Sequence, residues 1–363
     1  MTERISAFRK SLKACLENQI NPDIVFPVMK NIDFFQQFIT HVTEPLGAGK
    51  HTRALLLSAG WELAANAHGA PMAGKQEKLP VFAGAAIELY QLSALVHDDV
   101  IDESPTRRGF PAAYINYQKQ HREKNLIGND LEYGIKSAIL LGDYLLSLAT
   151  LTFESAEHLD VPSFQRARRL FSQMSAEVAF GQYLDNRNDH TPFSADVEAQ
   201  ISNALSVLYH KAARYSVDLP LQIGACLNGA DDELLRKIHE IAVPLGEAFQ
   251  LRDDEIGIFS PSELTGKPEA GDITEAKRTV LLALTRSLAT PAQLTHLESL
   301  LGKALSPTEV DEIREIITSS GALAKQEKMI LARESECARR YENLGISSEI
   351  FEYCFNLLSS RKF

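Results

Sequence analysis

The 363-residue sequence contains only four cysteines and has no excess of basic residues, and both deficits exclude whole classes of protein. The cysteines are too sparse and too widely spaced for a disulfide framework or a zinc ribbon, and they indicate free thiols in a reducing cytosol. Acidic residues number 48 against 37 basic ones, so a net charge of −11 repels nucleic acid and anionic membranes. We therefore expect a cytoplasmic protein that does not bind nucleic acid.

Long hydrophobic runs are missing as well. The N-terminus interleaves charged and apolar residues and lacks the continuous apolar segment of a signal peptide. The most apolar stretch, Ala138 to Phe153, contains Asp143 and is shorter than the roughly 20 residues that a membrane span requires. We interpret this stretch as a core helix and expect no membrane span.

Apolar residues recur at helical spacing, as at Ile238, Ile241, Ala242 and Leu245. Alternating runs suited to strands are nearly absent. The 20 glycines and 15 prolines gather between helical stretches, at 71–74, 104–111, 189–192 and 260–271. No low-complexity linker or internal repeat divides the chain, so the pattern predicts one all-α domain over residues 1–363.

Three carboxylates, those of Asp98, Asp99 and Asp102, end one apolar helical segment. Asp98 and Asp102 are four residues apart, so on a helix they point the same way, about 6 Å apart along the axis. Like charges in apolar surroundings repel unless a cation bridges them, and ligands that are all oxygens favour Mg²⁺. Taken alone, the cluster is also compatible with a solvated helix end.

A second acidic pair, Asp253 and Asp254, follows another helical run far downstream. Carboxylate pairs on separate helices can face one another across a bundle and hold metals for a polyanionic ligand. Basic residues that could grip phosphate oxygens accompany both pairs and a glycine-bearing turn near the N-terminus. They are Arg107 and Arg108 after the first pair, Lys267 and Lys277 after the second, and Lys50 and Arg53 in the turn.

Together these motifs resemble the trans-isoprenyl diphosphate synthases, the family of farnesyl and geranylgeranyl diphosphate synthases, over most of the chain. The family's DDxxD motif and its RRG element correspond to Asp98–Asp102 and Arg107–Gly109. The GGKxxR, GQxxD and FQxxDDxxD elements correspond to Ala48–Arg53, Gly181–Asp185 and Phe249–Gly257.

Three positions depart from the family pattern. Ala48 replaces a glycine, and Ala212 replaces the threonine of a Lys-Thr pair whose lysine is Lys211. Gly257 replaces the third aspartate of the second acidic motif. This last change resembles a subgroup that reads DDLLG, so we interpret the site as a variant rather than an inactive one.

The resemblance implies a helical bundle of the isoprenoid synthase type with a central active-site cavity, and a homodimer. It also implies three Mg²⁺ ions with diphosphate bound. The implied metal ligands are Asp98, Asp102 and Asp253, supported by Asp99 and Asp254. The C-terminal Arg361 and Lys362 would close over the site, as basic tails do in some relatives.

Substrate contacts follow from the same resemblance. The allylic diphosphate would be held by Arg107, Lys211 and Lys267, with Lys277 as a further substrate-binding candidate. Isopentenyl diphosphate would lie against Lys50, Arg53, Gln91 and Arg108. Gln250 would direct a dipole toward the reacting cation.

The implied reaction begins when Mg²⁺ and basic residues favour the departure of diphosphate, which leaves an allylic cation. A helical bundle lined by apolar side chains keeps water from this cation. The alkene of isopentenyl diphosphate attacks the cation, and loss of a proton gives a longer trans-prenyl diphosphate.

Product length in this family depends on residues just upstream of the first acidic motif, because the growing tail runs along that helix. Ser93 and Ala94 are small, and Tyr90 lies about one turn deeper and could form the floor of the tunnel. We therefore predict geranylgeranyl diphosphate as the main product. Farnesyl or longer products remain open, as does an ordinary packing role for these three residues.

Two other functions compete with this interpretation. An HD-type metal phosphohydrolase would use the His97–Asp98 pair with His51 and His68, but it would leave the second acidic motif unused. A catalytically weak or silent partner subunit of a prenyl diphosphate synthase is favoured only by the departures at Ala212 and Gly257.

Replacement of Ser93 by Phe tests the predicted tunnel. A phenyl ring at this position should block the growing tail, so the main product should shorten toward farnesyl diphosphate. The measurement is chromatographic analysis of the products. An unchanged length distribution would remove Ser93 from the tunnel.

Overall fold

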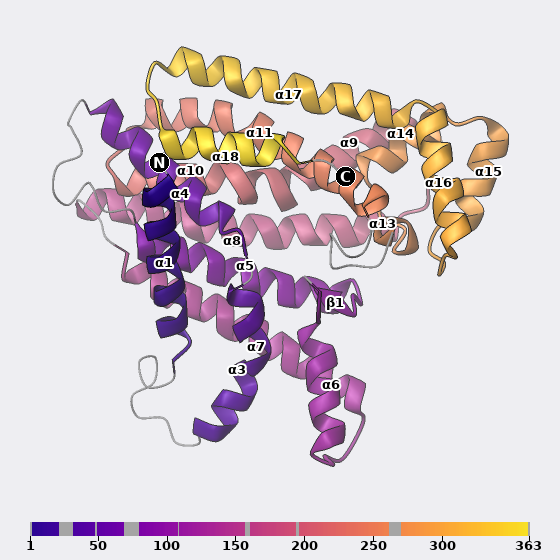
Figure 1. The fold of residues 1–363 in the computed structure, drawn as a ribbon, viewed down its shortest axis with the longest axis horizontal. Coiled ribbons are helices and arrows are strands. Elements are labelled where there is room, and N and C mark those ends of the chain that lie inside the picture. The colour runs from indigo at the N-terminus through magenta and orange to yellow at the C-terminus, as the bar shows by residue number, and fades with distance from the viewer. Residues whose placement is uncertain are drawn as a thin grey trace. The chain divides into compact units, whose positions relative to one another are not determined.

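The computed structural model describes residues 2–21, 32–47, 49–68, 80–107, 109–156, 160–193, 196–260 and 270–361. Almost all of the regular structure in these residues is helical (Figure 1). The exceptions are the two-residue strands β1 (Thr106–Arg107) and β2 (Phe110–Pro111), which pair antiparallel. The predicted all-α fold is therefore confirmed.

Internal contacts divide the chain into two compact units. The first unit comprises Met1–Arg168, Ile223–Ala230 and Ser347–Phe351, and the second comprises Arg169–Gln222, Asp231–Ile346 and Glu352–Phe363. Each unit is assembled from stretches that are far apart in the sequence, so no single linker separates them. The single domain over residues 1–363 stays a prediction.

The helices of the first unit are α1 (Thr2–Gln19), α3 (Ile32–Gly47), α4 (Thr52–Ala67), α5 (Val81–Ile101), α6 (Ala113–Glu123) and α7 (Asp130–Glu154). Those of the second unit are α9 (Val197–Val207), η2 (Leu208–Asp218), α11 (Asp232–Phe259), α13 (Gly271–Thr274), α14 (Val280–Leu288), α15 (Pro291–Leu300), α16 (Pro307–Ser319) and α17 (Ala322–Leu344). Unit boundaries fall within α8 (Val161–Asp189), α10 (Leu219–Leu227) and α18 (Glu349–Ser359).

The core of the first unit is built around α4 and α5. Every residue of α4 from Ala54 to Ala65 is buried, and Trp61 is among the largest fully buried side chains. The α5 helix packs against α1, α4 and α7. The small side chains of Ala83, Ala85 and Ala86 on α5 allow this close approach of several helices.

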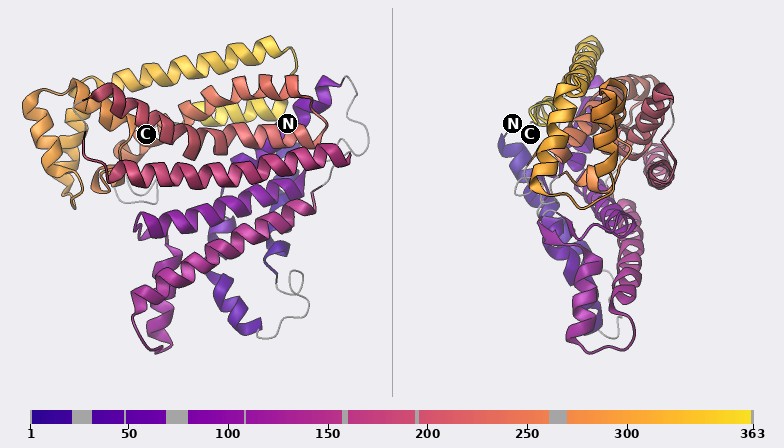
Figure 2. Two further views of the ribbon diagram at one scale, coloured as in Figure 1. Left: turned by 180° about the vertical axis from the view of Figure 1, so that it is seen from behind. Right: turned by 90° about the vertical axis from the view of Figure 1, so that its right-hand side faces the viewer.

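The apolar stretch that we interpreted as a core helix lies in α7, which runs beside α5 in both views (Figures 1 and 2). Only one face of this helix is buried. It carries Leu141, Leu145 and Leu148, among other residues. On the other face Leu140 is 61% exposed and Leu151 is 56% exposed. The helix therefore contributes one face to the core, whereas its opposite face carries exposed apolar side chains.

The length and apolar composition of α7 alone would also allow it to cross a membrane, and among the described residues no other helix qualifies. Its contacts with α5 and α6 bury one of its faces within the first unit.

The second unit is organised by η2, an 11-residue π-helix that continues directly from α9 and packs against α11. The α17 helix lies along α11, as Figure 1 shows. Two glycines permit close helix contact at η2. A Cβ on Gly181 of α8 would lie 2.6 Å from the backbone nitrogen of Lys211, and one on Gly246 of α11 would lie 2.6 Å from the carbonyl oxygen of Ala213. No larger residue fits at either glycine without displacing backbone.

Candidate active site

The first acidic motif lies at the C-terminal end of α5. Asp102 is the C-cap, and its backbone N–H donates to the carbonyl oxygen of Asp98 at 2.8 Å. Asp99 is 3% exposed, and the side chain of Asp98 is 17% exposed. A helix C-terminus carries partial negative charge, so three carboxylates here are unfavourable unless a cation accompanies them.

That cation is the guanidinium of Arg107, which the β1–β2 pair holds beside the motif. Arg107 pairs with Phe110 in register, and Gly109 makes the turn with a φ of 80°, a conformation that favours glycine. The Nε atom of Arg107 donates to Oδ1 of Asp99 at 2.7 Å, and Nη2 donates to Oδ2 of Asp98 at 3.0 Å. Burial alone would lower the pKa of Arg107, but the neighbouring carboxylates raise it above its ordinary value.

His97 packs against α7 and does not join a metal cluster. Its Nε2 donates to the carbonyl oxygen of Ile139 at 3.2 Å and lies 3.5 Å from Oδ1 of Asp143. The ring covers Gly142, where a Cβ would lie 2.1 Å from Nε2. In the described part of the chain, no group of three or more His, Cys, Asp or Glu residues is arranged to hold a metal ion.

The basic residues predicted to bind isopentenyl diphosphate lie at the start of α4. Lys50 is exposed, and Arg53 is half-buried in the first turn. Gln91 is half-buried on α5, which packs against α4. Arg108 lies outside the described residues.

The three predicted chain-length residues lie on the same helix, upstream of the acidic motif. Ser93 is buried, and its hydroxyl donates to the carbonyl oxygen of Gly142 at 2.7 Å, so its side chain faces α7. Tyr90 is 5% exposed and Ala94 is half-buried. Their role in product length stays a prediction.

In the second unit, Lys211 and the GQxxD element lie together. The Nζ atom of Lys211 on η2 donates to Oδ2 of Asp185 on α8 at 2.5 Å. This contact depends on Gly181, because the missing side chain lets α8 approach the backbone of η2. The neighbouring Ala212 is buried.

The second acidic motif lies on the last turns of α11. Gln250 donates through Nε2 to Oδ1 of Asp254 at 3.0 Å, so this amide orients a carboxylate. Asp253 accepts from Arg361 at 2.6 Å, and the guanidinium of Arg361 lies 4.8 Å from the ring centre of Phe249. Arg361 thus covers the motif within the second unit, whereas Lys362 lies outside the described residues.

Asp254 is buried among other carboxylates. Burial is the largest cause that raises its pKa well above the ordinary value, and Asp272, Asp253 and Asp185 raise it further. The hydrogen bond from Gln250 acts in the opposite sense but does not offset these effects. The environment therefore favours a neutral Asp254 until a cation arrives.

The variant position Gly257 leaves room for Asp272. A Cβ at residue 257 would lie 2.8 Å from Oδ2 of Asp272 and 3.2 Å from its Cγ. Asp272 is the second residue of α13 and does not belong to either acidic motif. Its backbone carbonyl accepts from the N–H of Lys277 at 2.8 Å, and the side chain of Lys277 pairs with Glu275 at 2.9 Å.

Of the predicted basic residues, Lys267 lies outside the described part of the chain, as Arg108 does. Sequence reasoning missed Asp272 and also missed Glu88, a buried carboxylate on α5. Glu88 precedes Gln91 by three residues, so its helical spacing was a usable signal. Nothing in the local pattern singles out Asp272.

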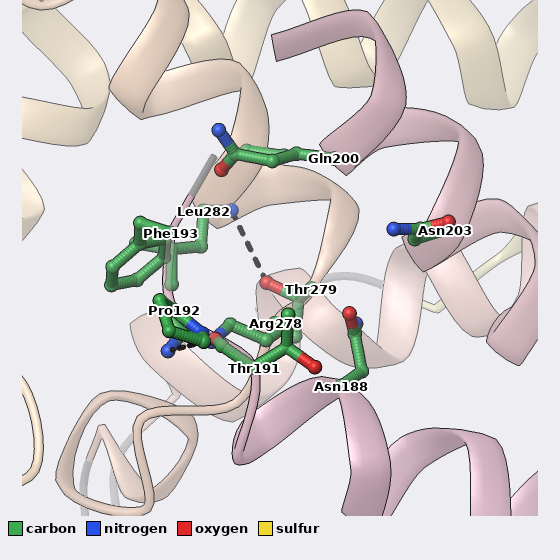
Figure 3. A pocket seen from close by; sticks show the side chains of 10 residues that line it. Asn188, Thr191, Pro192, Phe193, Gln200, Asn203, Arg278, Thr279 and Leu282 are labelled. Carbon is green, nitrogen blue, oxygen red and sulfur yellow. Dashed lines mark hydrogen bonds between the residues drawn. The ribbon is translucent and has the colours of Figure 1, made fainter. Parts of the chain in front are cut away.

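A small, partly open pocket lies elsewhere in the second unit, between the end of α8, the start of α14 and α9 (Figure 3). The lining residues include Asn188, Gln200, Arg278 and Thr279. Phe193 at its edge lies between the guanidinium groups of Arg278 and Arg286, at 3.3 and 3.5 Å from the ring centre. None of the predicted site residues lines this pocket.

The type of donor in both motifs fits a hard cation such as Mg²⁺, although among the described residues no three such donors are gathered around one point. The donors of both motifs are carboxylate oxygens, and His97 is turned toward α7. Asp254 has a raised pKa among like charges, which is the environment that a bound cation relieves. Arg107 and Arg361 pair with the carboxylates that would coordinate the metal.

A comparison with protein families matches residues 33–319 to the family described as Polyprenyl synthetase. The geranylgeranyl diphosphate synthase of Saccharolobus solfataricus is 28% identical over 91% of this chain and 88% of its own length. The nonaprenyl diphosphate synthase of Mycobacterium tuberculosis is 31% identical over 71% of this chain and 68% of its own length.

Among solved structures, the chain is similar to the geranylgeranyl pyrophosphate synthase of Corynebacterium glutamicum, crystallised with isoprenyl diphosphate and magnesium. The TM-score is 0.86 at 30% sequence identity, and the match covers 97% of each chain.

Replacement of Asp254 by Asn tests the raised pKa of this carboxyl group. In metal-free protein, unfolded Asp254 loses its proton near its ordinary pKa of 3.8, whereas folded Asp254 keeps it to higher pH. Its contribution to stability therefore falls as the pH rises above that value. The variant has no proton to lose, so its unfolding temperature in EDTA should exceed that of the wild type by a margin that grows with pH.

Asp311, which is 77% exposed, provides the control for this experiment. Asp311→Asn should follow the wild-type curve at every pH. If the Asp254→Asn and wild-type curves run parallel from acidic to neutral pH, Asp254 does not have a raised pKa.

Proposed function

Because this chain belongs to the polyprenyl synthetase family, we propose that it condenses isopentenyl diphosphate with an allylic diphosphate to make a trans-prenyl diphosphate. The family and the fold that the motifs predicted are confirmed. The observation that carries the proposal is the match along 97% of a geranylgeranyl pyrophosphate synthase at 30% identity.

We propose that Asp98 and Asp102 in the first unit, and Asp253 in the second, are Mg²⁺ ligands, with Asp99 and Asp254 in support. When bound, the metal neutralises charge that develops on the departing diphosphate. The guanidinium of Arg107 already contacts the first motif and can turn its other donors to phosphate oxygens. Asp99 orients this guanidinium. In the proposed site Asp99 therefore acts through Arg107 rather than as a metal ligand.

In the second unit, Lys211 is the proposed diphosphate contact, with Lys267 and Lys277 beside the second motif. Asp185 fixes the ammonium group of Lys211 through a 2.5 Å contact. In the second motif, the amide of Gln250 orients the carboxylate of Asp254, and the guanidinium of Arg361 pairs with the carboxylate of Asp253. We propose that Arg361 leaves Asp253 when metal and substrate bind, and that the tail then covers the diphosphate.

We propose geranylgeranyl diphosphate as the main product. The relatives are named for products of several lengths, from farnesyl to nonaprenyl diphosphate, so their names do not fix the length for this chain. The proposal is supported by the small side chains of Ser93 and Ala94. The hydroxyl of Ser93 lies 2.7 Å from the backbone of α7, so a bulky residue there would have to move α7 or enter the tunnel.

The proposed enzyme acts in the cytoplasm as a homodimer. All four cysteines are buried and none of them forms a disulfide, in keeping with a reducing compartment. The exposed face of α7, with Ile139, Leu140 and Leu151, is the proposed interface, because an apolar helix face is seldom left to water.

The proposed activity is tested with purified protein, Mg²⁺, isopentenyl diphosphate and one of three primers: dimethylallyl, geranyl or farnesyl diphosphate. We expect condensation with geranylgeranyl diphosphate as the main product, and we expect EDTA to reduce turnover about a hundredfold or more. Release of phosphate without condensation would favour the hydrolase. No turnover with any primer would favour the silent subunit.

The proposed interface is tested by Leu140→Glu, because a charge on a shared apolar face should prevent dimer formation. We expect light scattering to give twice the chain mass for the wild type and the chain mass for this variant. Ile127→Glu is the control, because Ile127 is 97% exposed and lies outside α7. A dimer that persists in Leu140→Glu would exclude this face.

A further inference from the structure

We propose that Glu88, acting through His51, is a positioning residue for the isopentenyl diphosphate site. Both residues are buried in the first unit, at 7% and 8% exposure. The inference rests on the proposed function, because it names what holds Lys50 and Arg53 in place rather than a further substrate contact.

Both carboxylate oxygens of Glu88 are used on the segment that carries these basic residues. Oε2 lies 3.1 Å from Nδ1 of His51, and Oε1 accepts from the backbone N–H of Ala54 at 3.2 Å. Ala54 lies in the first turn of α4, where helix N–H groups lack partners within the helix. One side chain of α5 thus ties down residues 51–54 at two points.

The carboxylate is charged despite its burial. Burial would raise the pKa of Glu88, but the hydrogen bond and charge of His51, the charge of Arg53 and the N–H of Ala54 together lower it. A buried anion of this kind is stable only while its partners stay in place, so it penalises any movement of the segment.

The backbone at His51 shows why the segment needs such an anchor. His51 has a φ of 51°, a left-handed conformation that non-glycine residues rarely adopt. This residue reverses the chain direction between Lys50 and the first turn of α4. The carbonyl oxygen of Lys50 also accepts from Nη2 of Arg9 at 3.1 Å, so the turn is held on both sides of His51.

The face of α5 that carries Glu88 also carries Gln91, which is another predicted contact for isopentenyl diphosphate. Gln91 follows Glu88 by three residues, which places it one helical turn further along the same face. Glu88 cannot itself bind the diphosphate, because its oxygens are occupied and its negative charge would repel phosphate. Its effect on substrate must pass through the side chains that it positions.

Glu62 provides a matched control within the first unit. It is also buried, at 4% exposure, pairs through Oε1 with Arg4 of α1, and accepts through Oε2 from Ser348 Oγ and from the N–H of Ile350. These contacts anchor a different segment. Loss of its charge should cost stability without a selective effect on either substrate.

The experiment compares Glu88→Gln, Glu62→Gln and the wild type in steady-state kinetics with each substrate varied. Loss of a charged hydrogen bond at the anchor should raise KM for isopentenyl diphosphate about tenfold, with KM for the allylic diphosphate changed less than about twofold. Glu62→Gln should lower the unfolding temperature and leave both KM values within about twofold.

A binding measurement separates this inference from the proposed activity. Equilibrium dialysis with labelled isopentenyl diphosphate, without Mg²⁺, should show wild-type binding and about tenfold weaker binding by Glu88→Gln. If the wild type neither binds nor condenses this substrate, the proposed function fails. If the wild type binds and Glu88→Gln binds equally well, only the positioning role fails.

If Glu88→Gln does not fold, the variant His51→Gly tests the same positioning role. Glycine adopts the left-handed φ freely, so this variant removes the imidazole without straining the turn. We expect the same selective rise in KM for isopentenyl diphosphate. An equal rise in both KM values, or no rise in either, would overturn the proposal.

Discussion

The need to balance carboxylate charge away from water governs both units. A buried or half-buried carboxylate is costly unless a cation or several N–H groups accompany it. In the first unit Arg107 balances Asp98 and Asp99. In the second unit Lys211 balances Asp185. Because side chains already fill these roles, the proposed metal and diphosphate would bind by exchange with these ion pairs.

Close helix contacts determine where these charges lie in the second unit. Gly181 and Gly246 admit the backbone of η2 from two sides. A π-helix carries one extra residue per turn relative to its neighbours, so it displaces side chains along its length from where an α-helix would place them. The position of Lys211 on η2 is therefore a property of the whole helix and of the two glycines that flank it.

The sequence was sufficient for the helical fold and for placing the two acidic motifs near helix ends, because periodicity and short spacings are local signals. It was insufficient wherever the burial or the partner of a side chain depended on a helix far away in the sequence. Ile139 and Leu140 carry the same apolar signal as Leu141, yet they are exposed. Glu88 was overlooked because a glutamate in a helix is usually solvated, and its partner His51 is the N-cap of another helix. The π-helix leaves no trace in apolar spacing.

Gly257 illustrates how one position constrains another across the fold. The carboxylate of Asp272 occupies the space that any side chain at residue 257 would need. An engineer who restored the family consensus by introducing aspartate at this position alone would create a steric and electrostatic conflict. The two positions are thus coupled, because any side chain introduced at residue 257 requires the carboxylate of Asp272 to move.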